Sequence, residues 1–188
     1  MLFIIDMQND YIDPKSSSYI KDSEFLVPGI IKKIKAYELK GDQIFYTSDI
    51  NIPDKQSLQV GNKIENSNDK IGIHKVETKL SPVMKLGSQP YGALKLLLKN
   101  HTEIKKSYYA IPPEILAEIQ QRFKGKKHII EKIEFVGVET NICVLANAIC
   151  VQSAFPDATI IVDTKLCLSK DNANHQYAIK IMESLGVN

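Results

Sequence analysis

Residues 134–149 contain the feature that most limits what this chain can fold into. An apolar run at 135–138 includes a glycine, and a second apolar stretch of helical length starts at Val144. Between them, Thr140 and Asn141 are residue types that favour the start of a helix. A buried strand joined to a helix by a tight turn is typical of α/β proteins. The segment therefore predicts such a fold.

The same alternation extends along the chain. Strands are expected at 2–5, 43–47, 103–106, 133–138 (with 128–130 as an alternative position) and 158–162. Helices are expected at 27–40, at 91–99, from 112 onward and at 171–185. This order predicts a three-layer Rossmann-like α/β domain, with a mostly parallel, doubly wound sheet and helices on both faces. We expect one domain over 1–188, with 50–89 as an irregular loop or lid.

The composition excludes several classes of protein. Hydrophobic residues make up 44% and charged residues 24%, which are values of an ordinary globular protein. The net charge of +2 is small and the lysines are scattered, so we expect no nucleic-acid partner. No apolar run reaches membrane-spanning length, and the start of the chain lacks a signal peptide, which predicts a cytoplasmic protein. Three cysteines without close pairing indicate reduced thiols.

Cys143 is the candidate nucleophile. It falls in the first turn of the predicted helix, where free backbone N–H groups and the helix dipole favour a thiolate. Most free cysteines are inert small apolar residues, and we interpret Cys150 and Cys167 in that way. The position of Cys143 after a strand favours chemistry over this simpler interpretation.

Two charged candidates end other predicted strands. Asp6 follows the apolar run at 2–5, and Lys105 and Lys106 end the run at 103–106. Parallel sheets gather their active-site groups at the carboxyl ends of their strands. Taken alone, Asp6 could simply cap a turn and the lysines could be surface residues. Together with Cys143 they predict a catalytic group.

Three motifs resemble the isochorismatase-like cysteine hydrolases, the superfamily of nicotinamidases and N-carbamoylsarcosine amidase. Residues 4–11 (IIDMQNDY) resemble its opening motif, which normally ends in Phe, and residues 137–144 (GVETNICV) resemble its nucleophile motif. Residues 105–110 (KKSYYA) resemble its lysine segment, in which the lysine precedes a tyrosine by three positions. That spacing favours Lys105, and the neighbouring Lys106 leaves the assignment open by one residue.

The resemblance implies a triad of Asp6, Lys105 and Cys143. In this scheme Cys143 attacks an amide carbonyl and forms a thioester, which water then cleaves. The lysine stabilises the thiolate, and Asp6 takes the thiol proton and later activates water. The backbone N–H groups of Glu139 and Cys143 would form the oxyanion hole, with a cis peptide bond between Val138 and Glu139.

The resemblance also implies a binding pocket. Tyr11 and Tyr108 are candidate aromatic walls for a substrate, and both could equally be core residues. Nicotinamidases hold a metal through an Asp-x-His pair and a later histidine. Here Asp49 and His74 match, but Asn51 replaces the first histidine, and asparagine is a poor ligand for a transition metal. The triad itself requires no cofactor, and a divalent metal such as zinc would have only Asp49 and His74.

These observations predict an amidase-type hydrolase that cleaves a C–N bond of a small molecule, with nicotinamide as one candidate. Two alternatives remain: vinyl ether hydrolysis of the isochorismatase type, and a catalytically silent small-molecule binding protein on the same fold. The resemblance further implies a homo-oligomer.

Overall fold

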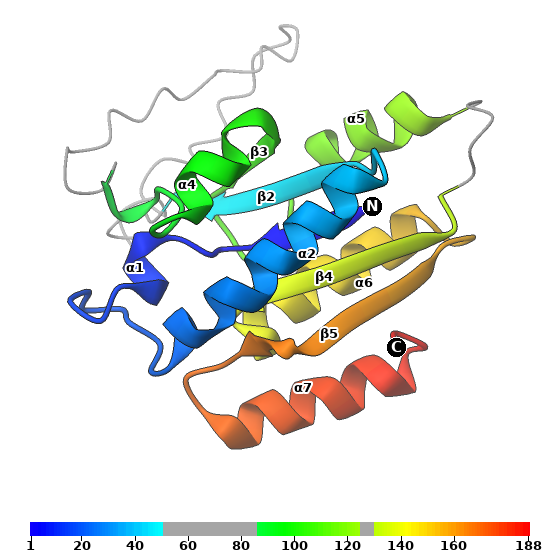
Figure 1. The fold of residues 1–188 in the computed structure, drawn as a ribbon. Helices are drawn as coiled ribbons and strands as arrows, with labels where there is room; N and C mark the ends of the chain where they lie inside the picture. The colour runs from blue at the N-terminus through cyan, green and yellow to red at the C-terminus, as the bar shows by residue number, and fades with distance from the viewer. Residues whose placement is uncertain (51–85, 125–129) are drawn as a thin grey trace, which may run out of the picture.

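The computed structural model describes residues 1–50, 86–124 and 130–188. Its centre is a five-stranded parallel sheet with the strand order β3-β2-β1-β4-β5 (Figure 1). The strands are β1 (Leu2–Ile5), β2 (Ile44–Asp49), β3 (Thr102–Lys106), β4 (Lys132–Val138) and β5 (Thr159–Leu168). The predicted strands therefore exist close to the expected positions, and β5 continues six residues beyond the expected end at 162.

Helices connect the strands. The α-helices are α1 (Asn9–Ile12), α2 (Val27–Leu39), α4 (Leu94–Leu97), α5 (Pro113–Phe123), α6 (Leu145–Ala154) and α7 (Asn172–Ser184). Short 3-10 turns at Ser23–Leu26 and Leu98–Asn100 precede α2 and extend α4, and a π-helical turn at Thr140–Val144 leads into α6. Within these ranges, no helix is long and apolar enough to cross a membrane.

Two apolar clusters cover the two faces of the sheet. Side chains of α1, α2 and α4 pack against one face, and side chains of α5, α6 and α7 pack against the other (Figure 1). The expected helices on both faces are thus confirmed, and this is the layered α/β architecture that the sequence predicts. The sequence analysis did not predict α1, a single helical turn that follows β1. Its Ile12 is fully buried, and this burial favours order there.

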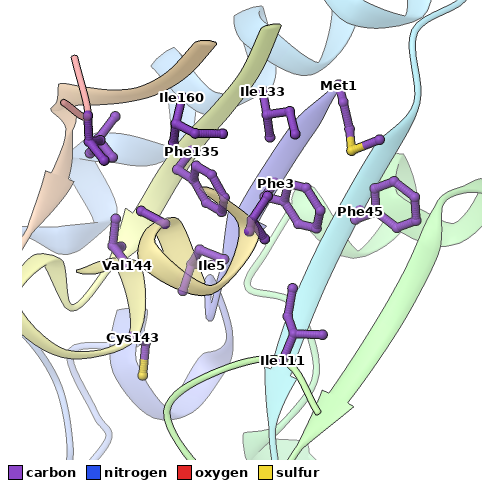
Figure 2. Packing of buried hydrophobic residues seen from close by; sticks show 14 of the residues in the cluster. Met1, Phe3, Ile5, Phe45, Ile111, Ile133, Phe135, Cys143, Val144 and Ile160 are labelled. Atoms are coloured by element: carbon purple, nitrogen blue, oxygen red, sulfur yellow. The ribbon is translucent and has the colours of Figure 1, made fainter. Parts of the chain in front are cut away.

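A row of three phenylalanines fixes the register of the central strands. Phe3 on β1 stacks on Phe45 of β2 and on Phe135 of β4, with ring centroids 5.1 Å apart in both pairs (Figure 2). All three rings are almost fully buried. Since a slip of one residue would turn each ring to the opposite face, this row specifies the pairing strongly.

The strand order creates a switch point between β1 and β4. From β1 the chain continues outward to β2 and β3, and then returns to the other side of β1 to form β4 and β5. In open parallel sheets, ligand sites form at the carboxyl ends of the strands beside such a point. The groups that follow β1 and β4 are Asp6 and the turn carrying Cys143.

Candidate active site

Asp6, Lys106 and Cys143 meet at the carboxyl ends of β1, β3 and β4. The Lys106 ammonium lies 2.7 Å from Oδ2 of Asp6 and 3.4 Å from Sγ of Cys143. Asp6 is fully buried, and Lys106 and Cys143 are 1% and 7% exposed. Figure 2 shows Cys143 at the lower end of the apolar cluster, beyond Ile5 and Val144. Burying an ion pair costs desolvation free energy, so its presence next to a thiol suggests that the pair has a function.

The Asp6 carboxylate is held by β2. Thr47 donates a hydrogen bond from its hydroxyl to Oδ1 of Asp6 at 2.6 Å, and the same hydroxyl accepts from the Asp6 backbone N–H at 3.0 Å. Burial raises the pKa of Asp6, against the opposing effects of Lys106, Thr47 and the Cys143 thiol. Sequence reasoning did not single out Thr47, although a polar residue in the apolar strand β2 was an available signal.

The lysine of the site is Lys106, and the prediction of Lys105 is corrected. The Lys105 side chain is 64% exposed and extends toward Glu103, whereas the Lys106 side chain is fully buried beside the aspartate and the thiol. The reason is the alternation of side chains along a strand, which puts Lys106 on the same face as the buried Ile104. The spacing to the tyrosines selected Lys105, whereas the two-residue alternation from the buried Ile104 would have selected Lys106.

Lys106 keeps its charge in this environment. Burial alone would lower the pKa of its ammonium, but Asp6, Cys143 and Asp49 together raise it. Its third contact is the backbone carbonyl of Tyr108, which accepts a hydrogen bond at 3.1 Å. The ammonium therefore lies fixed between a carboxylate, a carbonyl and the sulfur.

Cys143 lies in a π-helical turn rather than in a regular first turn of α6. Burial and the Asp6 carboxylate raise the pKa of its thiol, while Lys106 acts in the opposite direction. The helix start was expected to favour a thiolate, and burial and the Asp6 carboxylate act against that effect. That expectation considered the helix alone and omitted burial and the neighbouring carboxylate. Burial likewise raises the pKa of Cys167 to about 12, in line with its expected inertness.

Asn147 connects the nucleophile helix to the lysine segment. Its side chain accepts a hydrogen bond from the N–H of Ile111 at 2.8 Å. It also donates to the carbonyls of Tyr109 and Cys143, at 3.0 and 2.7 Å. The residue is fully buried. Sequence reasoning missed Asn147, and an asparagine inside an apolar helix was the signal that could have found it.

The turn that precedes Cys143 contains the expected cis peptide bond between Val138 and Glu139. Thr140, directly after it, is fully buried, and its hydroxyl forms a hydrogen bond of 2.9 Å with Nδ1 of His175 on α7. The backbone N–H groups of Glu139 and Cys143 belong to this turn, and their role as oxyanion donors stays a prediction.

The two predicted aromatic residues lie in different environments. Tyr11, on α1, donates its hydroxyl to Oδ2 of Asp49 at 2.9 Å, and burial together with that carboxylate raises the pKa of Tyr11. The Tyr108 side chain is 60% exposed, and its backbone carbonyl contacts Lys106. The Tyr11 hydroxyl is therefore held by Asp49 at the end of β2. The function of both rings as substrate walls stays a prediction.

The described residues do not fit a metal centre. Asp49 already accepts a hydrogen bond at one oxygen, and no group of three His, Cys, Asp or Glu that could hold a metal occurs in the described ranges. Asn51 and His74 lie outside the described residues. Among the residues that can be placed, Asp49 alone remains of the predicted metal ligands.

The arrangement can support nucleophilic catalysis by sulfur. A carboxylate in contact with a thiol can accept its proton, and an ammonium beside the same sulfur stabilises the thiolate that results. The site thus combines a nucleophile, a base and a fixed positive charge in one buried group, and these are the elements that acyl transfer needs.

A comparison with protein-family models matches residues 1–188 to the model described as isochorismatase domain. A search of curated proteins found no match.

Solved structures similar to this chain include two nicotinamidases and a pyrazinamidase. A nicotinamidase from Bacillus subtilis is 19% identical, with a TM-score of 0.73 over 100% of this chain and 96% of that chain. A nicotinamidase from Staphylococcus aureus is 21% identical, with a TM-score of 0.68 over 100% and 95%. A pyrazinamidase from Pyrococcus horikoshii, solved in complex with zinc, is 16% identical, with a TM-score of 0.72 over 100% and 96%. At these identities the likeness concerns the fold.

Proposed function

This chain belongs to the isochorismatase family, and we propose that it is a cysteine hydrolase that cleaves the C–N bond of a small amide through a thioester on Cys143. Membership in this family supports a hydrolase, and the nicotinamidase and pyrazinamidase neighbours favour amide substrates. The observation that carries the mechanism is the Lys106 ammonium, which contacts both the Asp6 carboxylate and the Cys143 sulfur.

In the first half of the reaction, Asp6 accepts the proton of the Cys143 thiol as the sulfur attacks the amide carbonyl. The Lys106 ammonium stabilises the developing thiolate, which the buried site otherwise disfavours. The backbone N–H groups of Glu139 and Cys143 stabilise the oxyanion. Asp6 then returns its proton to the leaving nitrogen, the C–N bond breaks, and an amine or ammonia departs from an acyl-cysteine.

In the second half, water replaces the leaving group. Asp6, again a carboxylate, accepts a proton from water as the water oxygen attacks the thioester carbonyl. Collapse of this intermediate breaks the C–S bond and releases the carboxylic acid, and the sulfur recovers its proton from Asp6. One aspartate thus acts first on the thiol and later on water, as its contact with the sulfur permits.

The direct test is ammonia release by the purified protein from a panel of small primary amides headed by nicotinamide. Cys143→Ala should abolish release, while Cys150→Ala, a change at a half-buried cysteine farther along α6, should leave it intact. Mass spectrometry of a rapidly quenched reaction should detect the acyl group on the peptide containing Cys143.

Other outcomes would favour the alternatives. A carbonyl product formed without ammonia would indicate vinyl ether hydrolysis. Absence of turnover on every substrate, with Cys143 no more readily alkylated than Cys150, would contradict the nucleophile and leave the binding-protein interpretation.

A further inference from the structure

Asp49 has one carboxylate oxygen that the catalytic scheme does not use. The residue is 7% exposed, and its Oδ1 has no hydrogen-bond partner among the described residues, while Oδ2 accepts from Tyr11. A buried carboxylate oxygen without a donor is costly, so a residue kept in this state needs an explanation. The catalytic scheme above gives it none.

The position of Asp49 directs it toward the catalytic group. In the parallel register Asp49 is paired with Lys106, and the Ile50 N–H donates to the Lys106 carbonyl at 2.8 Å. Side chains paired in this way point to the same face of the sheet, which here is the face that bears Cys143. Asp49 contributes to the raised pKa of Lys106, and Asp6 and Cys143 contribute to the raised pKa of Tyr11.

Asp49 is also held rigidly. The Gln8 side chain bonds its backbone on both sides, donating to the Asp49 carbonyl at 3.1 Å and accepting from the Asp49 N–H at 2.8 Å. Tyr11 fixes one oxygen of the carboxylate. Oδ1 is therefore a preorganised acceptor at the end of β2, next to the strand that ends in Lys106, and preorganisation of this kind is what a ligand-binding group requires.

The Lys106 ammonium and the Tyr11 hydrogen bond favour a hydrogen-bond donor over a divalent metal at Oδ1. The carboxyl groups of Asp6, Asp49 and Asp10 lie around this region, and Lys106 contributes a fixed positive charge. A divalent cation would lie close to the Lys106 ammonium, with one oxygen of Asp49 already occupied by Tyr11. An N–H group, neutral or singly charged, fits the free oxygen without that repulsion.

We propose that Asp49 binds a second N–H donor of the substrate, so that this site selects small amides with an additional N–H group near the scissile carbonyl. This rests on the proposed amide hydrolysis and adds the substrate class to it. Tyr11 acts as a positioning residue that holds the carboxylate in place. The site then recognises its substrate through a hydrogen bond at the position where the resemblance implies a metal.

Binding can be measured apart from turnover. Isothermal titration with Cys143→Ala protein would compare matched amides that differ in one N–H group, such as pyrrole-2-carboxamide with furan-2-carboxamide and glycinamide with propionamide. We expect tighter binding of the N–H member by about ten- to a hundredfold, as for a hydrogen bond to a charged acceptor. Adding Asp49→Asn should remove most of this difference. Adding Ser48→Ala should preserve it, because the Ser48 hydroxyl bonds Glu103 rather than a residue of the site.

Turnover and metal content complete the test. With the wild-type protein, kcat/KM should show the same preference, and metal analysis should find no stoichiometric metal. Equal binding of both members of each pair, binding of neither, or a preference unchanged by Asp49→Asn would overturn the proposal. So would one equivalent of zinc that Asp49→Asn removes. Absence of turnover together with the predicted binding preference would refute the hydrolase and retain the role of Asp49.

Discussion

The orientation of one lysine side chain determines the charge next to the Cys143 sulfur. Lys106 is enclosed with Asp6 and Cys143, and its neighbour Lys105 lies in solvent. Because the two residues are adjacent and chemically identical, each is the other's control.

Lys106→Met should reduce kcat/KM by about a hundredfold or more, because the developing thiolate loses its fixed positive charge. Lys105→Met should change kcat/KM by no more than about twofold, as is usual for an exposed side chain. Steady-state ammonia release by the two variants checks this. Thermal unfolding should accompany it, since Lys106→Met leaves Asp6 buried without its partner. Equal effects of both substitutions would contradict the assignment of Lys106.

The protonation of Asp6 predicts the acid side of the pH profile. Asp6 must be a carboxylate to accept the thiol proton, and burial raises its pKa above the ordinary value of 3.8. As the pH falls through this raised pKa, the base becomes protonated and kcat/KM should decrease. The acid limb should therefore lie above the pH expected for an ordinary aspartate.

Measuring kcat/KM across the pH range checks this, with circular dichroism at each pH to confirm that the protein stays folded. A limb at or below the ordinary aspartate value would show that the carboxylate is not shifted. An activity that instead rises only near the pKa of a free thiol would mean that ionisation of Cys143 precedes substrate binding.

Asn147 joins α6 to the segment after β3. Two of its three hydrogen bonds connect α6 with Tyr109 and Ile111, which follow Lys106, and the third is to the carbonyl of Cys143 in the turn before α6. The distance between sulfur and ammonium therefore depends on a contact between two elements that lie far apart in the sequence. A polar residue at this position thus supports both stability and the geometry of the site.

Asn147→Ala should lower the free energy of unfolding by about 1 to 3 kcal/mol for each buried backbone group that loses its partner. Activity should decrease beyond the loss of folded protein, because the lysine segment is no longer held to the helix. Ser153→Ala is the matched control, since Ser153 is exposed on α6 and its hydroxyl donates to the Ile149 carbonyl of the same helix. Denaturant unfolding and kcat/KM should be measured for both variants to separate the loss of stability from the loss of activity. A stable but inactive protein would assign Asn147 to positioning alone.

Much of the whole molecule could be predicted from sequence because the patterns are local. The apolar runs predicted the five strands, and Gly137 near the end of β4, with the helix starters Thr140 and Asn141 after it, predicted the turn before Cys143. The choice between Lys105 and Lys106 failed because motif spacing was used where the side-chain alternation of β3 was decisive. Thr47 and Asn147 were missed because their partners are distant in sequence.

The shift in the pKa of the Cys143 thiol could not be predicted from the sequence around the cysteine. It depends on burial and on Asp6, which follows a different strand. No local pattern around the cysteine contains that information. The predicted homo-oligomer and cytoplasmic location stay predictions.

The pairing of β1 with β4 positions the two halves of the site relative to each other. Gly137 on β4 faces Ile5 on β1 and has a φ of 120°. A Cβ atom at Gly137 would lie 2.1 Å from the Ile5 carbonyl oxygen, which belongs to the backbone and cannot rotate away. The glycine therefore allows the strands that lead to Asp6 and to Cys143 to approach closely at the switch point.

Gly137→Ala should therefore lower the stability of the fold and displace the groups at the carboxyl ends of β1 and β4. The positive φ alone costs about 1 to 3 kcal/mol, and the clash with β1 adds to it. Gly41→Ala is the control, because Gly41 also has a positive φ, of 68°, but a Cβ atom there meets nothing within 4 Å. We expect Gly41→Ala to lower stability by about 1 kcal/mol and to leave kcat/KM unchanged. Gly137→Ala should lower both, because separating β1 from β4 moves the base away from the sulfur. A Gly137→Ala protein that unfolds at the temperature of the Gly41→Ala protein and retains full activity would show that the site does not depend on this approach.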